Sequence, residues 1–134
     1  MKSHESTTAG TRPIVLLASL LLRGLAFAQG PAVPTGLMCE LMARPELATI
    51  TDPTPRFSWI VGSTGRQAAY QILVASDRES LDRSQGDLWD SGKVASDETI
   101  HIAYGGRPLR SSQPVFWKVR VWDKDGMRSA WSSP

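Results

Sequence analysis

Cysteine and histidine are scarce in this sequence, and their scarcity excludes several kinds of site. The 134 residues include one cysteine, Cys39, and two histidines. Of the two histidines, only His101 lies beyond residue 28. A lone cysteine cannot form an internal disulfide, and a zinc site needs more cysteine or histidine ligands than this chain offers. A Ser-His-Asp triad would depend on His101, which lies in a short alternating run typical of a strand. We therefore expect no metal, no cofactor and no histidine-based catalysis, and we expect Cys39 to be a buried small hydrophobe.

A clear excess of one charge sign is also missing. The sequence holds 15 basic and 13 acidic residues. Three of the basic residues and one of the acidic ones lie in residues 1–28, which leaves 12 of each in residues 29–134. No Lys/Arg cluster in that part argues for a nucleic-acid partner. The 106 residues after position 28 are enough for one domain with a real core, and not for two.

The first 28 residues have the pattern of a secretory signal peptide rather than of a folded segment. A positively charged start precedes the apolar run 14–22, and the small-x-small sequence that ends at Ala28 is typical of a cleavage site. We predict cleavage between Ala28 and Gln29 and export to the periplasm or the extracellular space. A membrane anchor is the alternative, but a span needs about 20 apolar residues and Arg23 interrupts this run.

Short alternating runs separated by turn residues make up the rest of the chain. Residues 29–35 read as an extended leader, and the prolines between Ala43 and Pro55 exclude a helix there. Asp77 to Leu81 is expected to form a single helical turn, because Ser76 and Asp77 are good N-caps. This pattern predicts an all-β fold over residues 36–134, an antiparallel sandwich of the immunoglobulin or fibronectin type III kind. The expected strands are 36–42, 56–61, 68–76, 87–94, 99–104 and 117–122.

Alternation within the runs predicts which side chains face the core. The inward set is Phe57, Trp59, Val61, Tyr70, Ile72, Val74, Trp117, Val119 and Val121, and the outward set is Gln71, Leu73, Lys118, Arg120 and Trp122. An outward tryptophan flanked by two basic residues indicates a docking surface for another domain or a ligand, made of Trp122, Lys118 and Arg120. The alternative is that Trp122 only covers the edge of the sandwich.

Two groups of aspartates could be read as a calcium site or a sugar-cleaving site, and a turn explains each group instead. Asp123-x-Asp125-Gly126 lacks the later ligands of a calcium loop, so we expect a hairpin turn that leads into a partner strand from Ser129. That last strand is expected to be incomplete at Pro134. Asp87 and Asp90 flank Trp89, as in a sugar cleft, but their spacing along a strand does not aim both at one cleft. We expect Trp89 to pack against the sandwich.

Five motifs in order resemble one family. They are Pro55-Arg56-Phe57-Ser58-Trp59, Gln67 to Ser76 (QAAYQILVAS), Leu88 to Val94 (LWDSGKV), Tyr104 to Leu109 (YGGRPL) and Phe116 to Gly126 (FWKVRVWDKDG). Together they resemble the N-terminal fibronectin-type β-sandwich of bacterial α-L-rhamnosidases of glycoside hydrolase family 78. The resemblance covers about residues 36–134.

The resemblance implies a role without catalysis for this region. Enzymes of that family carry their catalytic acids in an (α/α)6 barrel that follows several accessory β-domains, and no catalytic residue maps onto this chain. One hypothesis is therefore an accessory domain of an exported rhamnosidase, with the downstream domains of the same polypeptide as its partners. The other hypothesis is a free-standing secreted module that binds a carbohydrate, such as a rhamnose-containing glycan, or a protein through an exposed tryptophan.

Overall fold

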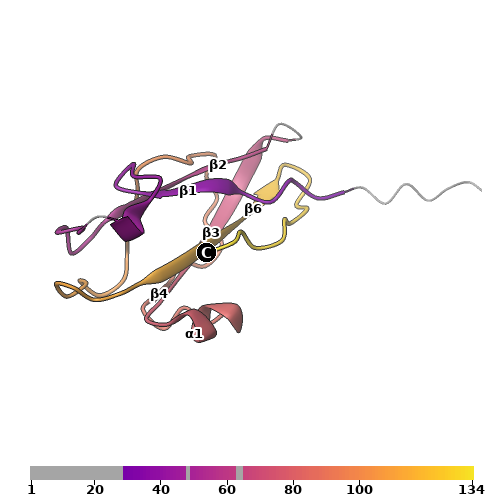
Figure 1. Ribbon diagram of the computed structural model, residues 1–134. Helices are drawn as coiled ribbons and strands as arrows, with labels where there is room; N and C mark the ends of the chain where they lie inside the picture. Colours follow the sequence, from indigo (N-terminus) through magenta and orange to yellow (C-terminus); the bar gives the residue numbers. More distant parts are fainter. Residues whose placement is uncertain (1–28, 48, 63–64) are drawn as a thin grey trace, which may run out of the picture.

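The computed structural model describes residues 29–134 except 48, 63 and 64, so the predicted signal peptide and its cleavage site at Ala28 lie outside the described residues. The strands are β1 (Thr35–Cys39), β2 (Arg56–Ile60), β3 (Gln67–Ala75), β4 (Trp89–Asp90), β5 (Ile102–Ala103) and β6 (Phe116–Asp123). A 3-10 turn, η1 (Pro45–Leu47), and one short helix, α1 (Arg78–Asp82), complete the elements (Figure 1). In the part of the chain described, no helix has the length and apolar character needed to span a membrane.

The strands form two antiparallel sheets that face each other. One sheet has the order β1-β2-β5 and the other has the order β4-β3-β6. The longest pairing joins β3 to β6, from Gln67 opposite Asp123 to Ala75 opposite Phe116. Figure 1 shows β3 and β6 side by side behind the β1-β2 layer, with α1 below them. The predicted all-β immunoglobulin-like sandwich is confirmed.

The core between the sheets contains the side chains that alternation predicted, although Val61 is only partly buried at its margin. Trp59 packs edge-on against Tyr70 with ring centroids 5.2 Å apart, and Phe57 lies 4.5 Å from Trp117. The β-branched side chains of Ile72, Val74, Val119 and Val121 fill the space between these rings and are fully buried. Cys39 lies in the same cluster, 5 % exposed, so the prediction of a buried small hydrophobe is confirmed.

Leu73 has a different environment from the one predicted. It lies on the outer face of β3 as alternation requires, yet it is 1 % exposed rather than in solvent. A second small cluster covers it, with Leu81 from α1 and the partly buried Phe116 and Trp131. The helix begins after Asp77, whose carboxylate accepts a 2.7 Å hydrogen bond from the backbone N–H of Ser80, as the predicted cap requires. The outer face of this sheet therefore carries a minor core.

Three strands are shorter than predicted. β1 ends at Cys39 because Glu40 and Leu41 have positive φ angles of 51° and 60°, and β5 begins only after His101, whose φ is 58°. The predicted strand 87–94 is reduced to β4 and an isolated bridge between Val94 and Tyr70. The alternation of side chains could not predict these positive φ angles. The residues concerned are not glycines, so their residue types carry no sign that the strands end there.

Candidate functional site

The outer face of β6 carries the three residues predicted to form a docking surface, and other residues already occupy it. The Arg120 guanidinium carbon lies 5.1 Å from the ring centroid of Trp122 and 4.3 Å from that of Trp131. Lys118 Nζ lies 5.0 Å from the Trp131 centroid, and Lys93 Nζ lies 5.0 Å from the Trp122 centroid. We call these five residues the cation–indole stack. Each indole in it has two cations within cation–π distance.

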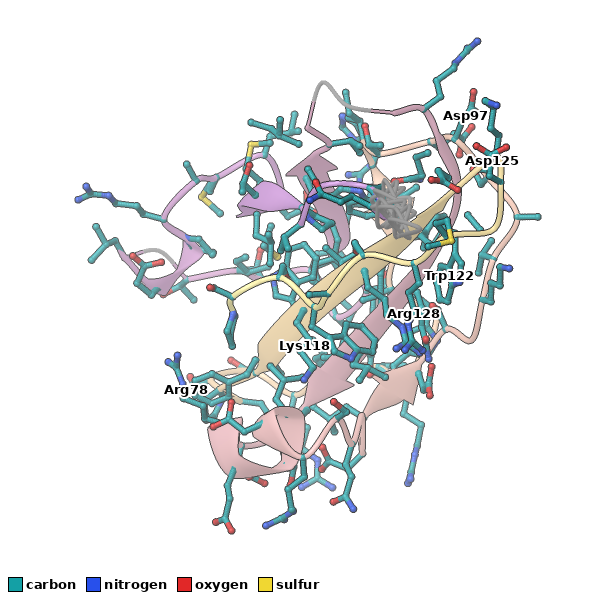
Figure 2. All side chains as sticks on the ribbon, turned by 90° about the vertical axis from the view of Figure 1, so that its right-hand side faces the viewer. Arg78, Asp97, Lys118, Trp122, Asp125 and Arg128 are labelled. Atoms are coloured by element: carbon teal, nitrogen blue, oxygen red, sulfur yellow. The ribbon has the colours of Figure 1, made fainter. Side chains whose placement is uncertain are left out.

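Lys118 is not the solvent-exposed side chain that alternation predicted. It is 6 % exposed, and its ammonium group donates a 3.1 Å hydrogen bond to the Ser84 hydroxyl, just beyond α1. Figure 2 shows Trp122, Arg128 and Lys118 following one another along this face toward α1. Desolvation by burial lowers the pKa of Lys118, and the nearby Asp82 carboxylate opposes this shift. The surface is thus partly covered, while Trp122 and Arg120 keep intermediate exposure.

Arg120 is the centre of the cation–indole stack. Its Nε and Nη2 atoms donate hydrogen bonds of 3.0 and 2.7 Å to Gln71 Oε1, and Gln71 Nε2 donates to Asp90 Oδ1 at 2.8 Å. Burial lowers the pKa of Arg120, the positive charge of Arg128 lowers it further, and Asp90 opposes the shift. Among the ion pairs of the described residues, none involves Arg120 or Lys118. Indole faces and neutral oxygens are therefore the main partners of the buried Lys118 and the partly buried Arg120.

The segment after the hairpin is attached to β6 by serine side chains. Ser129 N–H donates to the Val121 carbonyl at 2.9 Å, and its hydroxyl oxygen accepts from Val121 N–H at 3.0 Å. Ser132 repeats this with Val119, at 2.9 and 3.1 Å. The predicted partner of β6 therefore lies where expected, although no regular strand is assigned to it. Sequence reasoning missed this role of Ser129, Ser132 and Trp131, and the Ser-x-x-Ser spacing was the available signal.

The turn at Asp123 is a hairpin turn, as predicted. Asp123 Oδ1 accepts the backbone N–H groups of Asp125 and Met127, both at 2.9 Å, and Gly126 has a φ of 79°. The carboxylate is therefore engaged in closing its own turn. No group of three or more potential metal ligands occurs among the residues that the structure describes.

Asp87 and Asp90 each have their own hydrogen-bond partners. Asp87 accepts from the Ser76 hydroxyl at 2.6 Å and from the Ser76 N–H at 2.9 Å, and these hydrogen bonds lower its pKa. Asp90 Oδ1 accepts from Gly92 N–H at 2.8 Å, in addition to Gln71. Trp89 packs against Tyr104 with centroids 5.4 Å apart, which confirms its predicted place in the sandwich.

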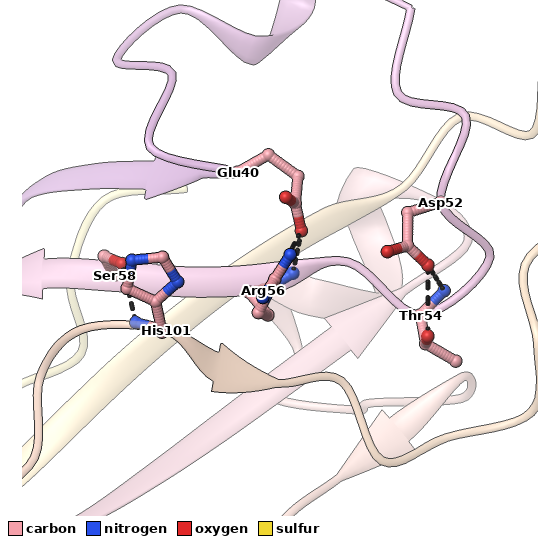
Figure 3. A network of polar contacts seen from close by, with 6 residues as sticks. All are labelled: Glu40, Asp52, Thr54, Arg56, Ser58 and His101. Atoms are coloured by element: carbon pink, nitrogen blue, oxygen red, sulfur yellow. Dashed lines mark hydrogen bonds and ion pairs between the residues drawn. The ribbon is translucent and has the colours of Figure 1, made fainter.

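The opposite face of the molecule has a polar network without catalytic geometry (Figure 3). The exposed His101 takes part through its backbone, whose N–H donates to Ser58 Oγ at 3.1 Å. Glu40 Oε1 accepts the Arg56 N–H at 2.6 Å and lies 3.5 Å from Arg56 Nε. These contacts hold the loops on either side of β2 to that strand.

Two shallow grooves lie on the surface of the described residues. The first has a volume of about 380 Å³ and lies between β1 and the last residues of the chain, lined by Val33, Pro34, Thr35, Gly36, Leu37, Ala43, Ser133 and Pro134. The second, of about 490 Å³, is lined by Asp87, Leu88, Arg107, Pro108, Leu109, Arg110 and Gln113. Neither groove includes a member of the cation–indole stack.

The two facing antiparallel sheets and their aromatic core define an immunoglobulin-like β-sandwich. The particular family follows from comparison with known proteins: residues 34–134 match the model of the Rha78A-like, N-terminal immunoglobulin domain, and the chain belongs to that family.

Similar proteins are much longer than this chain. An α-L-rhamnosidase of Streptomyces avermitilis is 49 % identical over 83 residues, which are 60 % of this chain and 8 % of the relative. One of Formosa agariphila is 40 % identical over 97 residues, 70 % of this chain and 10 % of the relative. The crystal structure of the S. avermitilis enzyme complexed with L-rhamnose matches 76 % of this chain and 10 % of its own, with a TM-score of 0.69 and 42 % identity. The chain thus spans about a tenth of these relatives.

Burial of Cys39 leads to a testable prediction about its reactivity. Desolvation, reinforced by the charge of Glu40, raises the thiol pKa from 9.0 to about 11. At pH 8 the thiolate fraction then falls from about one in ten to about one in a thousand. We expect alkylation by iodoacetamide at pH 8 to be at least ~100-fold slower in the folded chain than in guanidinium chloride. A folded rate that matches the denatured rate would show that the thiol is accessible and unshifted.

Proposed function

We propose that this chain is a non-catalytic N-terminal β-sandwich domain of a secreted α-L-rhamnosidase, which packs against and supports a catalytic domain elsewhere in the same protein. The observation that carries the proposal is the match of residues 34–134 to the N-terminal immunoglobulin domain family, within relatives about ten times as long. Export is part of the proposal and is supported by the signal-like pattern of residues 1–28.

The chemistry of the described residues supports a role without catalysis. Inverting glycoside hydrolysis needs two carboxyl groups on opposite sides of one sugar site. The best sequence candidates instead have separate structural partners: Asp87 accepts hydrogen bonds from Ser76 after β3, and Asp90 accepts one from Gly92 in its own turn. The most distinctive surface feature, the cation–indole stack, joins parts of the chain to one another. The alternative of a free-standing binding module through Trp122 stays a prediction, and a sugar at this ring would have to compete with the two cations beside it.

The proposal can be tested with the S. avermitilis α-L-rhamnosidase, which provides a catalytic partner of known identity. We expect deletion of its matching segment to lower the melting temperature and the yield of soluble enzyme. Replacement of that segment by residues 36–134 of this chain should restore both. Activity on an aryl α-L-rhamnoside is measured in parallel for the deletion, the chimera and the intact enzyme.

The isolated chain is the control for the absence of catalysis. It should release no rhamnose above the buffer rate, and its D87N/D90N variant should behave identically. Rhamnose release that grows with protein concentration and is lost in D87N/D90N would refute the non-catalytic assignment. A deletion enzyme as stable and active as the intact one would refute the supporting role.

A further inference from the structure

We infer that the cation–indole stack attaches the segment Arg128–Ser132 to the outer face of β6, and we call this attachment the fastening. The face predicted as a docking surface is therefore occupied by a segment of the chain itself. In this assignment Trp131 is the inserted side chain, and Lys118, Arg120 and Trp122 form the face that receives it. The fastening fixes where the polypeptide leaves the sandwich. Only this last step rests on the proposed function, because it assumes that further domains follow.

The order of side chains along the face supports a fastening. Trp131 has Arg120 at 4.3 Å and Lys118 at 5.0 Å from its centroid, and these two cations are neighbours on the same face of β6. Trp131 also packs against the cluster of Leu73, Ala75 and Leu81. One residue of the segment thus lies against two cations of β6 and against an apolar cluster formed by β3 and α1. A detached segment would expose this apolar cluster, leave Lys118 without its indole partner and leave Arg120 with the Trp122 ring alone.

The backbone of the segment makes few regular contacts, so side chains must supply much of the attachment. A full antiparallel ladder would use backbone donors and acceptors on both strands. Here Val119 N–H and Val121 N–H donate to serine hydroxyls instead of carbonyls. Both serines are buried, with exposed fractions of 4 % and 5 %. The two hydroxyl contacts set the register of the segment, and Trp131 lies between them in sequence.

The position of the fastening determines where the residues after Ser132 lie. Ser133 and Pro134 follow Ser132 directly and line the groove beside Val33 and Leu37 of the β1 region. A fixed Ser132 therefore fixes these residues against the other sheet. In a longer protein this would orient the next segment relative to both layers of the sandwich.

Amide hydrogen exchange on the purified chain tests the fastening without reference to any enzyme activity. Trp131→Leu keeps an apolar side chain but removes the π face, whereas Trp131→Phe keeps an aromatic face. We expect W131L to speed exchange at Val119 and Val121 by about tenfold, the effect of losing two cation–π contacts. W131F should change exchange by less than about threefold, because a phenyl face still receives both cations. Trypsin cleavage after the exposed Arg128 should accelerate in parallel.

Two controls separate a local release from a general loss of stability. The Tyr70 N–H donates a hydrogen bond to the Val94 carbonyl, on the side of β3 that faces away from β6. Its exchange rate in W131L should equal that in the wild type. Lys93→Ala, at the exposed end of the cation–indole stack and paired in it with Trp122 rather than Trp131, should leave Val119 exchange within about twofold. Equal effects of W131L and W131F, or equal acceleration at Tyr70 and Val119, would overturn the inference. Failure of the rhamnosidase chimera would leave these results unchanged.

Discussion

Replacement of Trp59 by alanine is expected to destabilise the domain by about 3–5 kcal/mol, the usual cost of removing a buried tryptophan from a core. Trp59 is 2 % exposed and packs against Tyr70 in the centre of the main cluster. Small domains are stable by only about 5–15 kcal/mol, so the variant should lose a large share of its free energy of unfolding. Urea denaturation followed by circular dichroism measures the loss as a shift of the midpoint.

The predicted cost for Trp59 has a polar component as well. The indole N–H donates to Gln67 Oε1 at 3.0 Å, and Gln67 Nε2 donates to the carbonyls of Ser96 and Glu98 at 3.0 and 2.8 Å. Gln67 is 6 % exposed and ties the 96–98 loop to β3. Removal of the indole leaves a buried amide oxygen without its donor, which costs about 1–3 kcal/mol.

Trp59→Phe separates the two components. It keeps an aromatic ring in the core but cannot donate to Gln67, so we expect a loss clearly smaller than that of Trp59→Ala. A W59F variant as unstable as W59A would mean that the hydrogen bond to Gln67, rather than packing, dominates. A W59A variant within ~1 kcal/mol of wild type would contradict the central place of this side chain in the core.

Side-chain alternation was enough to predict the main core. Phe57, Trp59, Ile72 and Val119 are buried where a period of two places them, because each belongs to a strand with one face against the opposing sheet. The turn at Asp123 was also predictable, since its residues contain both the capping carboxylate and the glycine needed at positive φ. Local chemistry decides both features.

The candidate site depended on contacts that alternation cannot reveal. The sequence places Lys118, Arg120 and Trp122 on one face of a strand, but it does not show that Trp131 returns over that face. The same segment and α1 bury Leu73, which a period of two assigns to solvent. Both differences come from irregular segments near the strand ends, whose course is set by tertiary contacts. Trp131 therefore lies against the face that was predicted as a docking surface.

The minor core on this outer face leads to the second large expected effect. Leu73→Ala should cost about 2–5 kcal/mol, as for other fully buried leucines, although alternation assigns residue 73 to the solvent side. The side chain is 1 % exposed and forms one cluster with Ala75 and Leu81, against which the partly buried Phe116 and Trp131 pack. Its removal leaves a cavity between β3, α1 and the fastened segment. The free energy of unfolding from urea titration measures the effect.

Leu47→Ala is the matched control, because it deletes the same atoms from a side chain that is 73 % exposed in η1. We expect it to change stability by no more than about 0.5 kcal/mol. If L73A lowered the free energy of unfolding no more than L47A, this would contradict the burial of Leu73 beneath α1 and Trp131. A large loss for L73A with increased exchange at Val119 would show that the minor core and the cation–indole stack hold the same segment. The outer face of β3 and β6 would then act as a second, smaller core that stabilises the domain.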